Sequence, residues 1–104
     1  MTNVAGWAMH HYIAIVEDAG PEAAIGLWFP DLPGCFSAGD TIDEAMENAP
    51  QAIGLYAEAL AKDGRELPPP RALLDLRNDP SVAADMRDNM VALVPAPVSA
   101  VAAE

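Results

Sequence analysis

Two short runs of apolar residues in the first third of the chain predict the first two strands. Residues 12–16, Tyr-Ile-Ala-Ile-Val, are rich in β-formers and end at the turn sequence Glu-Asp-Ala-Gly-Pro. Residues 24–29 alternate with the two-residue period of a strand, which places Trp28 on the face opposite Leu27 and Phe29. Because the connection between the two runs is short, we expect an antiparallel hairpin.

A long helix is predicted between Thr41 and Gly64. Thr41 and Glu44 form a capping-box sequence, in which the threonine hydroxyl accepts a backbone N–H and the glutamate reaches back to the cap. Apolar residues then recur at spacings of three and four, which gives the helix one apolar face. Pro50 interrupts this pattern, and because proline removes a backbone donor and clashes with the preceding turn, we expect a kink or a break near residues 46–50.

The remaining elements complete an α+β sequence of strands and helices. Two prolines and a glycine in residues 30–34 force a turn before a short third strand at residues 35–38. After the long helix, two short helical turns are predicted at residues 71–77 and 81–87, and residues 89–94 form the fourth strand.

This order of elements, β-β-β-α-(α)-β, predicts an α+β fold. The right-handed crossover rule places the last strand parallel to the first, in a sheet of order 3-2-1-4 with the helices on one face. Such an arrangement resembles the opening half of the ribonuclease H fold. We expect a loose leader over residues 1–11, one domain over residues 12–98 and a C-terminal tail over residues 99–104.

Length and charge narrow the class of protein. A chain of 104 residues with a net charge of −11 favours a single acidic domain. Neither a membrane-spanning apolar stretch nor a secretory signal is present in the sequence, which favours a cytoplasmic protein. No Lys or Arg precedes Lys62, although that stretch holds nine acidic residues. This half therefore opposes direct phosphate binding and attracts a basic partner, unless the acidic excess serves solubility alone.

The residue types that carry catalysis and metal binding are not grouped in this sequence. Cys35 is the single cysteine and has no paired base nearby, so we expect a buried core thiol. His10 and His11 are adjacent and point in opposite directions on an extended chain, which does not suit a metal site. A nuclease of the ribonuclease H type needs a carboxylate in its first strand, and residues 12–16 have none. We predict no catalytic, metal or cofactor site.

The turn and the helix start carry a more specific signal. Residues 29–35, Phe-Pro-Asp-Leu-Pro-Gly-Cys, are followed by Gly-Asp-Thr at residues 39–41 and by an alanine-rich helix. This pattern resembles the HicB antitoxin family over about residues 12–71. The resemblance implies a non-enzymatic antitoxin that binds a small basic HicA-type toxin, an RNA-cleaving protein, and covers its RNA-binding surface. Many members also carry a DNA-binding domain, but the few residues after the fourth strand predict no operator binding by this chain alone.

The acidic hairpin and the turn after it supply the predicted partner contacts, which are Glu17, Asp18, Glu22, Trp28 and Asp31. For Trp28 two interpretations stay open: an exposed interface anchor, or a side chain covered by the leader through Trp7 or Met9. For Asp31 an Asx-type turn competes with a partner contact.

Two other functions stay open beside the antitoxin. One is an oligomeric interaction module of the same fold, and the other is a metal-dependent hydrolase of the ribonuclease H type. We also expect a dimer or a tetramer, formed through the edge of the third strand or through the sheet face that carries Trp28, because the third strand has no lysine or proline to guard its edge.

Overall fold

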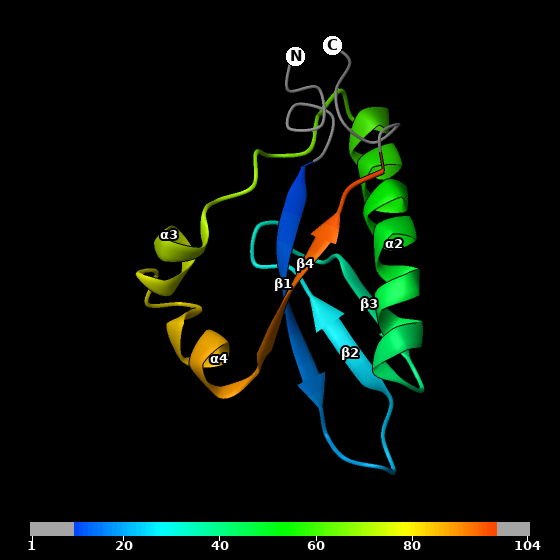
Figure 1. Ribbon diagram of the computed structural model, residues 1–104. Coiled ribbons are helices and arrows are strands. Elements are labelled where there is room, and N and C mark those ends of the chain that lie inside the picture. The colour runs from blue at the N-terminus through cyan, green and yellow to red at the C-terminus, as the bar shows by residue number, and fades with distance from the viewer. Residues whose placement is uncertain (1–9, 98–104) are drawn as a thin grey trace, which may run out of the picture.

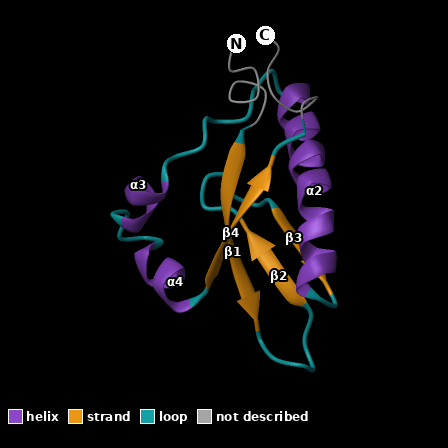
Figure 2. Cartoon of the chain, viewed as in Figure 1, coloured by secondary structure: helices purple, strands orange, loops and turns teal. Residues whose placement is uncertain are grey.

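The computed structural model describes residues 10–97, in which four antiparallel strands form one sheet with helices on both of its faces (Figures 1 and 2). The strands are β1 (His11–Asp18), β2 (Ile25–Trp28), β3 (Phe36–Gly39) and β4 (Met90–Pro95), and the helices are α2 (Ile42–Lys62), α3 (Leu73–Arg77) and α4 (Ala83–Asp88). The strand order β3-β2-β1-β4 confirms the predicted order, and each element lies within two residues of its predicted bounds. The expected C-terminal tail and residues 1–9 of the expected leader lie outside the described residues.

The direction of the fourth strand differs from the prediction. β4 pairs antiparallel with β1, from His11 opposite Pro95 to Val16 opposite Met90. A parallel strand would have to begin near the end of α2, beside the start of β1. Instead α3 and α4 carry the chain to the opposite end of the sheet, and β4 runs back from there (Figure 1). The crossover rule does not apply to a connection that changes ends in this way, so the parallel strand was a wrong prediction.

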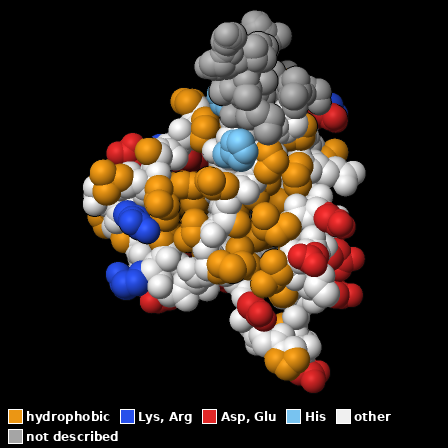
Figure 3. Space-filling view, in the orientation of Figure 1, with side chains coloured by type: hydrophobic (Ala, Val, Ile, Leu, Met, Phe, Trp, Pro, Cys, Tyr) orange, Lys and Arg blue, Asp and Glu red, His pale blue; other side chains and the backbone are white. Residues whose placement is uncertain are grey.

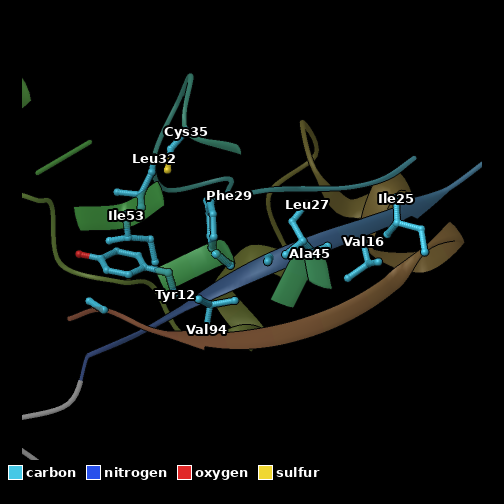
Figure 4. Packing of buried hydrophobic residues seen from close by; sticks show 13 residues of the cluster. Tyr12, Val16, Ile25, Leu27, Phe29, Leu32, Cys35, Ala45, Ile53 and Val94 are labelled. Carbon is cyan, nitrogen blue, oxygen red and sulfur yellow. The ribbon is translucent and has the colours of Figure 1, made fainter. Parts of the chain in front are cut away.

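The helices cover opposite faces of the sheet, which corrects the prediction that they share one face. Alternate residues of β1, among them Tyr12 and Ala14, pack with Ile53 of α2 in the larger core, and Figure 4 shows Tyr12 and Ile53 close together. Ile13 and Ile15 point to the other face. There they pack with residues of and beside α3 and α4, which are Leu76, Val82 and Met86. Every residue from 12 to 16 is buried, as is typical of a strand that is covered on both faces.

Helix α2 begins after the predicted cap residue Thr41, and Gly64 closes its C-terminal end just after the cap residue Asp63. The Thr41 hydroxyl accepts from the backbone N–H of Glu44 at 3.0 Å, and the Glu44 carboxylate accepts from the backbone N–H of Asp40 at 2.6 Å. At the other end Gly64 takes a φ of +73°, which allows a Schellman-type closure of the last turn. The helix is continuous through Pro50, so a break does not occur, and the kink stays a prediction. Buried residues on both sides of Pro50 hold the two halves of the helix against the sheet.

No helix in the described part of the chain combines the length and the apolar character that a membrane crossing needs.

Candidate partner-binding surface

The hairpin between β1 and β2 places three of the predicted contact residues at one end of the sheet. Glu17 and Asp18 end β1 and are exposed, and Glu22 lies exposed in the connecting turn. The Asp18 carboxylate accepts from the backbone N–H of Gly20 at 3.0 Å, while Gly20 takes a φ of +111° that favours glycine. The hairpin therefore holds several carboxylates at a defined, solvent-facing end of the molecule.

Trp28 and Glu17 are joined directly across the hairpin. The Trp28 Nε1–H donates to Glu17 Oε2 at 2.8 Å. Glu17 lies opposite Gly26, so Trp28 is its diagonal neighbour on the same face of the sheet. The half-buried indole packs beside the cluster that contains Ile15, which confirms that Trp28 lies on the face away from α2. Whether Trp7 or Met9 covers it is a question about residues outside those described, so both interpretations stay predictions.

Phe36 extends this aromatic surface and was missed by the sequence reasoning. It lies opposite Trp28 in the β2–β3 register, and its side chain is 70% exposed. Trp28 and Phe36 lie directly opposite each other, and Glu17 is diagonal to Trp28, so the three side chains share one face of the sheet, which we call the Trp28 face. The two-residue alternation of strands contained this signal, because residues directly opposite each other share a face.

Asp31 lies past the other end of β2 and is engaged within the chain. Its side chain is only 6% exposed, and it accepts from the Arg71 backbone N–H at 2.8 Å and from Arg71 Nε at 2.6 Å. Arg71 also donates to Asp79 at 3.0 Å. The carboxylate therefore bonds to a residue 40 positions away in place of the neighbouring backbone N–H groups that an Asx-type turn would use. The hydrogen bonds of Asp31 thus go to Arg71 and to no residue of the Trp28 face.

Tyrosine hydroxyls hold both the turn at residues 30–34 and the connector after α2. The Tyr56 hydroxyl donates to the Pro33 carbonyl at 2.9 Å, and the Tyr12 hydroxyl donates to the Pro68 carbonyl of the connector after α2. Burial, and to a lesser degree the charge of Asp31, raise the pKa of Tyr12, so its hydroxyl stays a donor. Hydrogen bonds to Asp31 and then to Asp79 raise the pKa of Arg71. This turn serves to fix the connector to the sheet.

Candidate chemistry is sparse in the described residues. Cys35 is buried and free, and burial raises the pKa of its thiol to about 11, which confirms the expected core thiol. Among residues 10–97, no three His, Cys, Asp or Glu side chains are grouped to hold a metal ion. What the surface offers is charge and apolar area. In Figure 3 hydrophobic side chains gather across the middle of the view, with acidic side chains toward α2 and basic ones toward α3 and α4.

A family model and solved structures both match the HicB antitoxins, and a curated relative without an assigned function is also similar to this chain. A family model described as the HicB-like antitoxin of bacterial toxin-antitoxin systems matches residues 12–103. An uncharacterised 14.9 kDa protein from the rep-hol intergenic region of Haemophilus phage HP1 is 49% identical over 51 residues, which span 49% of this chain and 38% of the phage protein. This chain thus matches well under half the length of that relative.

Solved structures give the same picture. The antitoxin HicB of Burkholderia pseudomallei superposes with a TM-score of 0.69 at 27% identity, over 92% of this chain and 70% of that chain. A chain of a HicA3 and HicB3 toxin-antitoxin complex superposes with a TM-score of 0.62 at 28% identity, over 81% of this chain and 94% of that chain.

Proposed function

This chain belongs to the HicB-like antitoxin family of bacterial toxin-antitoxin systems, and from that premise we propose that it binds and neutralises a small basic toxin of the HicA type. In this proposal the antitoxin covers the RNA-binding surface of the toxin and does not itself catalyse a reaction. The similarity to a chain of a toxin-antitoxin complex supports a toxin as the partner. A cytoplasmic location belongs to the same proposal, because a toxin that cleaves mRNA acts there.

The single observation that carries the binding mode is the Trp28–Glu17 pair at the acidic end of the hairpin. A hydrogen bond of 2.8 Å fixes the indole beside a carboxylate, and Asp18 and Glu22 add further negative charge nearby. Carboxylates around an aromatic anchor suit a basic protein, since charge guides the encounter and the ring provides apolar area. We assign Glu17, Asp18, Glu22 and Trp28 to toxin contact.

Asp31 has a different role in the proposal. Because its carboxylate is nearly buried and bonded to Arg71, it acts by fixing the turn and the connector in place. Its effect on toxin binding is therefore indirect.

The test removes charge from the hairpin without removing its hydrogen bonds. In the triple variant Glu17→Gln, Asp18→Asn and Glu22→Gln, the amide oxygens can still accept from Trp28 and Gly20. The matched control neutralises three acids of the α3–α4 segment, Asp75→Asn, Asp85→Asn and Asp88→Asn, and so changes net charge equally. Binding to a purified HicA-type toxin is measured by calorimetry, and inhibition by an RNA-cleavage assay.

We expect the hairpin variant to bind the toxin at least tenfold more weakly and the control to bind like the wild type. Equal affinity of the two triple variants would contradict the assignment of the contact residues. A wild-type chain that neither binds nor inhibits HicA-type toxins contradicts the proposed function and favours the interaction module.

A further inference from the structure

A hollow lies between α3 and the sheet, on the face of the sheet away from α2. Its volume is about 460 Å³, and the strands line it with Ile13 of β1 and with Val91 and Leu93 of β4. Leu93 lies opposite Ile13 in the β1–β4 register, so the two side chains share this face. Leu73 of α3 and Met86 of α4 line the hollow from the helix side. The concave surface is therefore built mostly from apolar side chains.

Size and exposure suit a small ligand. Ile13 and Met86 are nearly buried, whereas Leu73 and Leu93 are 41% and 62% exposed, so solvent reaches the apolar lining. The volume falls within the range of about 300–1,000 Å³ that small-molecule sites occupy. A stable protein interface needs much more surface, about 800 Å² on each partner. Among the described residues no Phe, Tyr or Trp lines the hollow, so it fits an aliphatic chain better than a ring.

The titratable side chains that line the hollow are all basic. They are His11, Arg71 and Arg77, and within the described part of the chain no Asp or Glu lines it, although the whole chain has 16 acidic residues and 5 Lys and Arg. Figure 3 shows basic side chains toward α3 and α4, beside the apolar area. Arg71 is already paired with Asp31 and Asp79. Arg77 is exposed and makes no ion pair among residues 10–97, so its guanidinium can bind a ligand anion.

We propose that this hollow binds an unbranched aliphatic carboxylic acid of about eight to ten carbons. The Arg77 guanidinium donates to the carboxylate, and the chain packs on Ile13, Leu73 and Leu93. A guanidinium suits this head group because two parallel N–H groups can bind both carboxylate oxygens.

The acidity of the whole chain does not prevent this binding. A net charge of −11 repels an anion at long range, but at physiological ionic strength salt screens charges that lie beyond about 8 Å. The groups that line the hollow therefore decide which charge is accepted there. The hollow lies at the start of β1, beside His11, whereas Glu17 and Asp18 lie at its end. The inference thus does not depend on the proposed toxin contact.

The first test uses the wild-type chain and ligands that share a chain length but differ in the head group. Octanoate, octanol and octyltrimethylammonium are titrated by calorimetry, each below the concentration at which it forms micelles. We expect octanoate to bind about fivefold more tightly than octanol, and the cation to bind more weakly than both. Decanoate should bind about tenfold more tightly than octanoate, because it buries two more methylene groups. No binding of decanoate, or equal affinity for the three head groups, would overturn the inference.

The second test uses matched variants at exposed positions. Arg77→Gln is compared with Arg87→Gln, because the exposed Arg87 does not line the hollow and the change in net charge is the same. Leu73→Ala is compared with Leu74→Ala, because Leu74 is 66% exposed and lies outside the hollow. We expect both hollow variants to bind decanoate about fivefold more weakly and both controls to bind like the wild type. Hollow variants that bind as tightly as their controls would contradict the site.

A third measurement separates this hollow from a smaller one of about 270 Å³ beside Phe36 and Leu55. In methyl NMR spectra of the wild type, decanoate should shift the signals of Ile13, Leu73 and Leu93 and leave the signal of Leu55 unchanged. Shifts at Leu55 without shifts at Ile13 would place the ligand in the smaller hollow and overturn the inference.

Discussion

Arg71 donates two hydrogen bonds to Asp31, one from its backbone N–H to Oδ2 at 2.8 Å and one from its Nε to Oδ1 at 2.6 Å. The two residues are 40 positions apart, so this contact closes the connector after α2 onto the turn after β2. The Nη1 of the same guanidinium donates to Asp79 Oδ2 at 3.0 Å. One arginine thus links the turn, the connector and the segment that leads into α4.

Removing either partner should destabilise the fold, with the larger effect at Asp31. Asp31→Ala leaves a backbone N–H and a guanidinium without their acceptor, which costs about 1–3 kcal/mol. Arg71→Ala keeps the backbone bond and removes a half-exposed side chain, so it should cost about 0.5–1 kcal/mol. Urea unfolding of both single variants and of the double variant measures this. If the two effects simply add, the contact does not couple the turn to the connector.

This contact also marks what the sequence could and could not predict. The start of α2 was predictable because Thr41 and Glu44 are three residues apart and bond locally. The β1–β2 hairpin was predictable for the same reason. The pairing of Asp31 with Arg71 has no local signal in the sequence. The two residues are 40 positions apart, and only the folded arrangement of the elements between them brings the side chains together.

The sequence did contain a signal that helices cover both faces of the sheet, but the prediction of a parallel fourth strand gave it no weight. Residues 12–16 are apolar without alternation, which is typical of a strand covered on both faces. A parallel β4 with the helices on one face would have left Ile13 and Ile15 exposed. Phe36 is a similar case, since only the register with Trp28 shows that the two rings share a face.

Replacing Gly39 or Gly54 with alanine should change the free energy of unfolding in opposite directions. A Cβ at Gly39 would lie 2.6 Å from the backbone nitrogen of Ala45 and 2.8 Å from Glu44 Cβ, so Gly39→Ala must displace the first turn of α2. We expect a loss of about 1–3 kcal/mol of unfolding free energy. At Gly54, inside α2, the nearest atom is Pro97 Cγ at 3.7 Å. Gly54→Ala should therefore stabilise by about 0.5–1 kcal/mol. Chemical denaturation of the two variants side by side checks both signs.

Acid should weaken the fold in part through Asp79. Hydrogen bonds from the Ser81 backbone and hydroxyl, and then from Arg71, lower the pKa of this carboxyl. A group with a lowered pKa in the folded state contributes stability above its unfolded pKa, and the contribution is lost as pH falls through the folded value. Asp79→Asn should flatten the fall of unfolding free energy between about pH 5 and pH 2, and Ser81→Ala should flatten it less. Unchanged slopes in both variants would rule out this source of acid sensitivity.

The thiol of Cys35 should react slowly while the protein is folded. Burial raises its pKa to about 11 from the ordinary value of 9.0, so the reactive thiolate is scarce at neutral pH and the sulfur is covered. We expect labelling by Ellman's reagent at about pH 8 to be at least tenfold slower than in denaturant. Stability from the neutral thiol is present below the unfolded pKa and is lost as pH rises toward 11. Fast labelling of the native chain would show that the segment around Cys35 opens readily.

Salt should weaken toxin binding, because the proposed contact joins unlike charges at the hairpin. Raising salt from about 50 mM to about 500 mM shortens the screening length from about 14 Å to about 4 Å, so the affinity should fall. Calorimetry of the wild type and of the hairpin triple variant over this range gives two slopes, and the variant should show the smaller one because three of its carboxylates are neutral. An affinity that does not depend on salt, or equal slopes for the two proteins, would show that the hairpin acids do not make the contact.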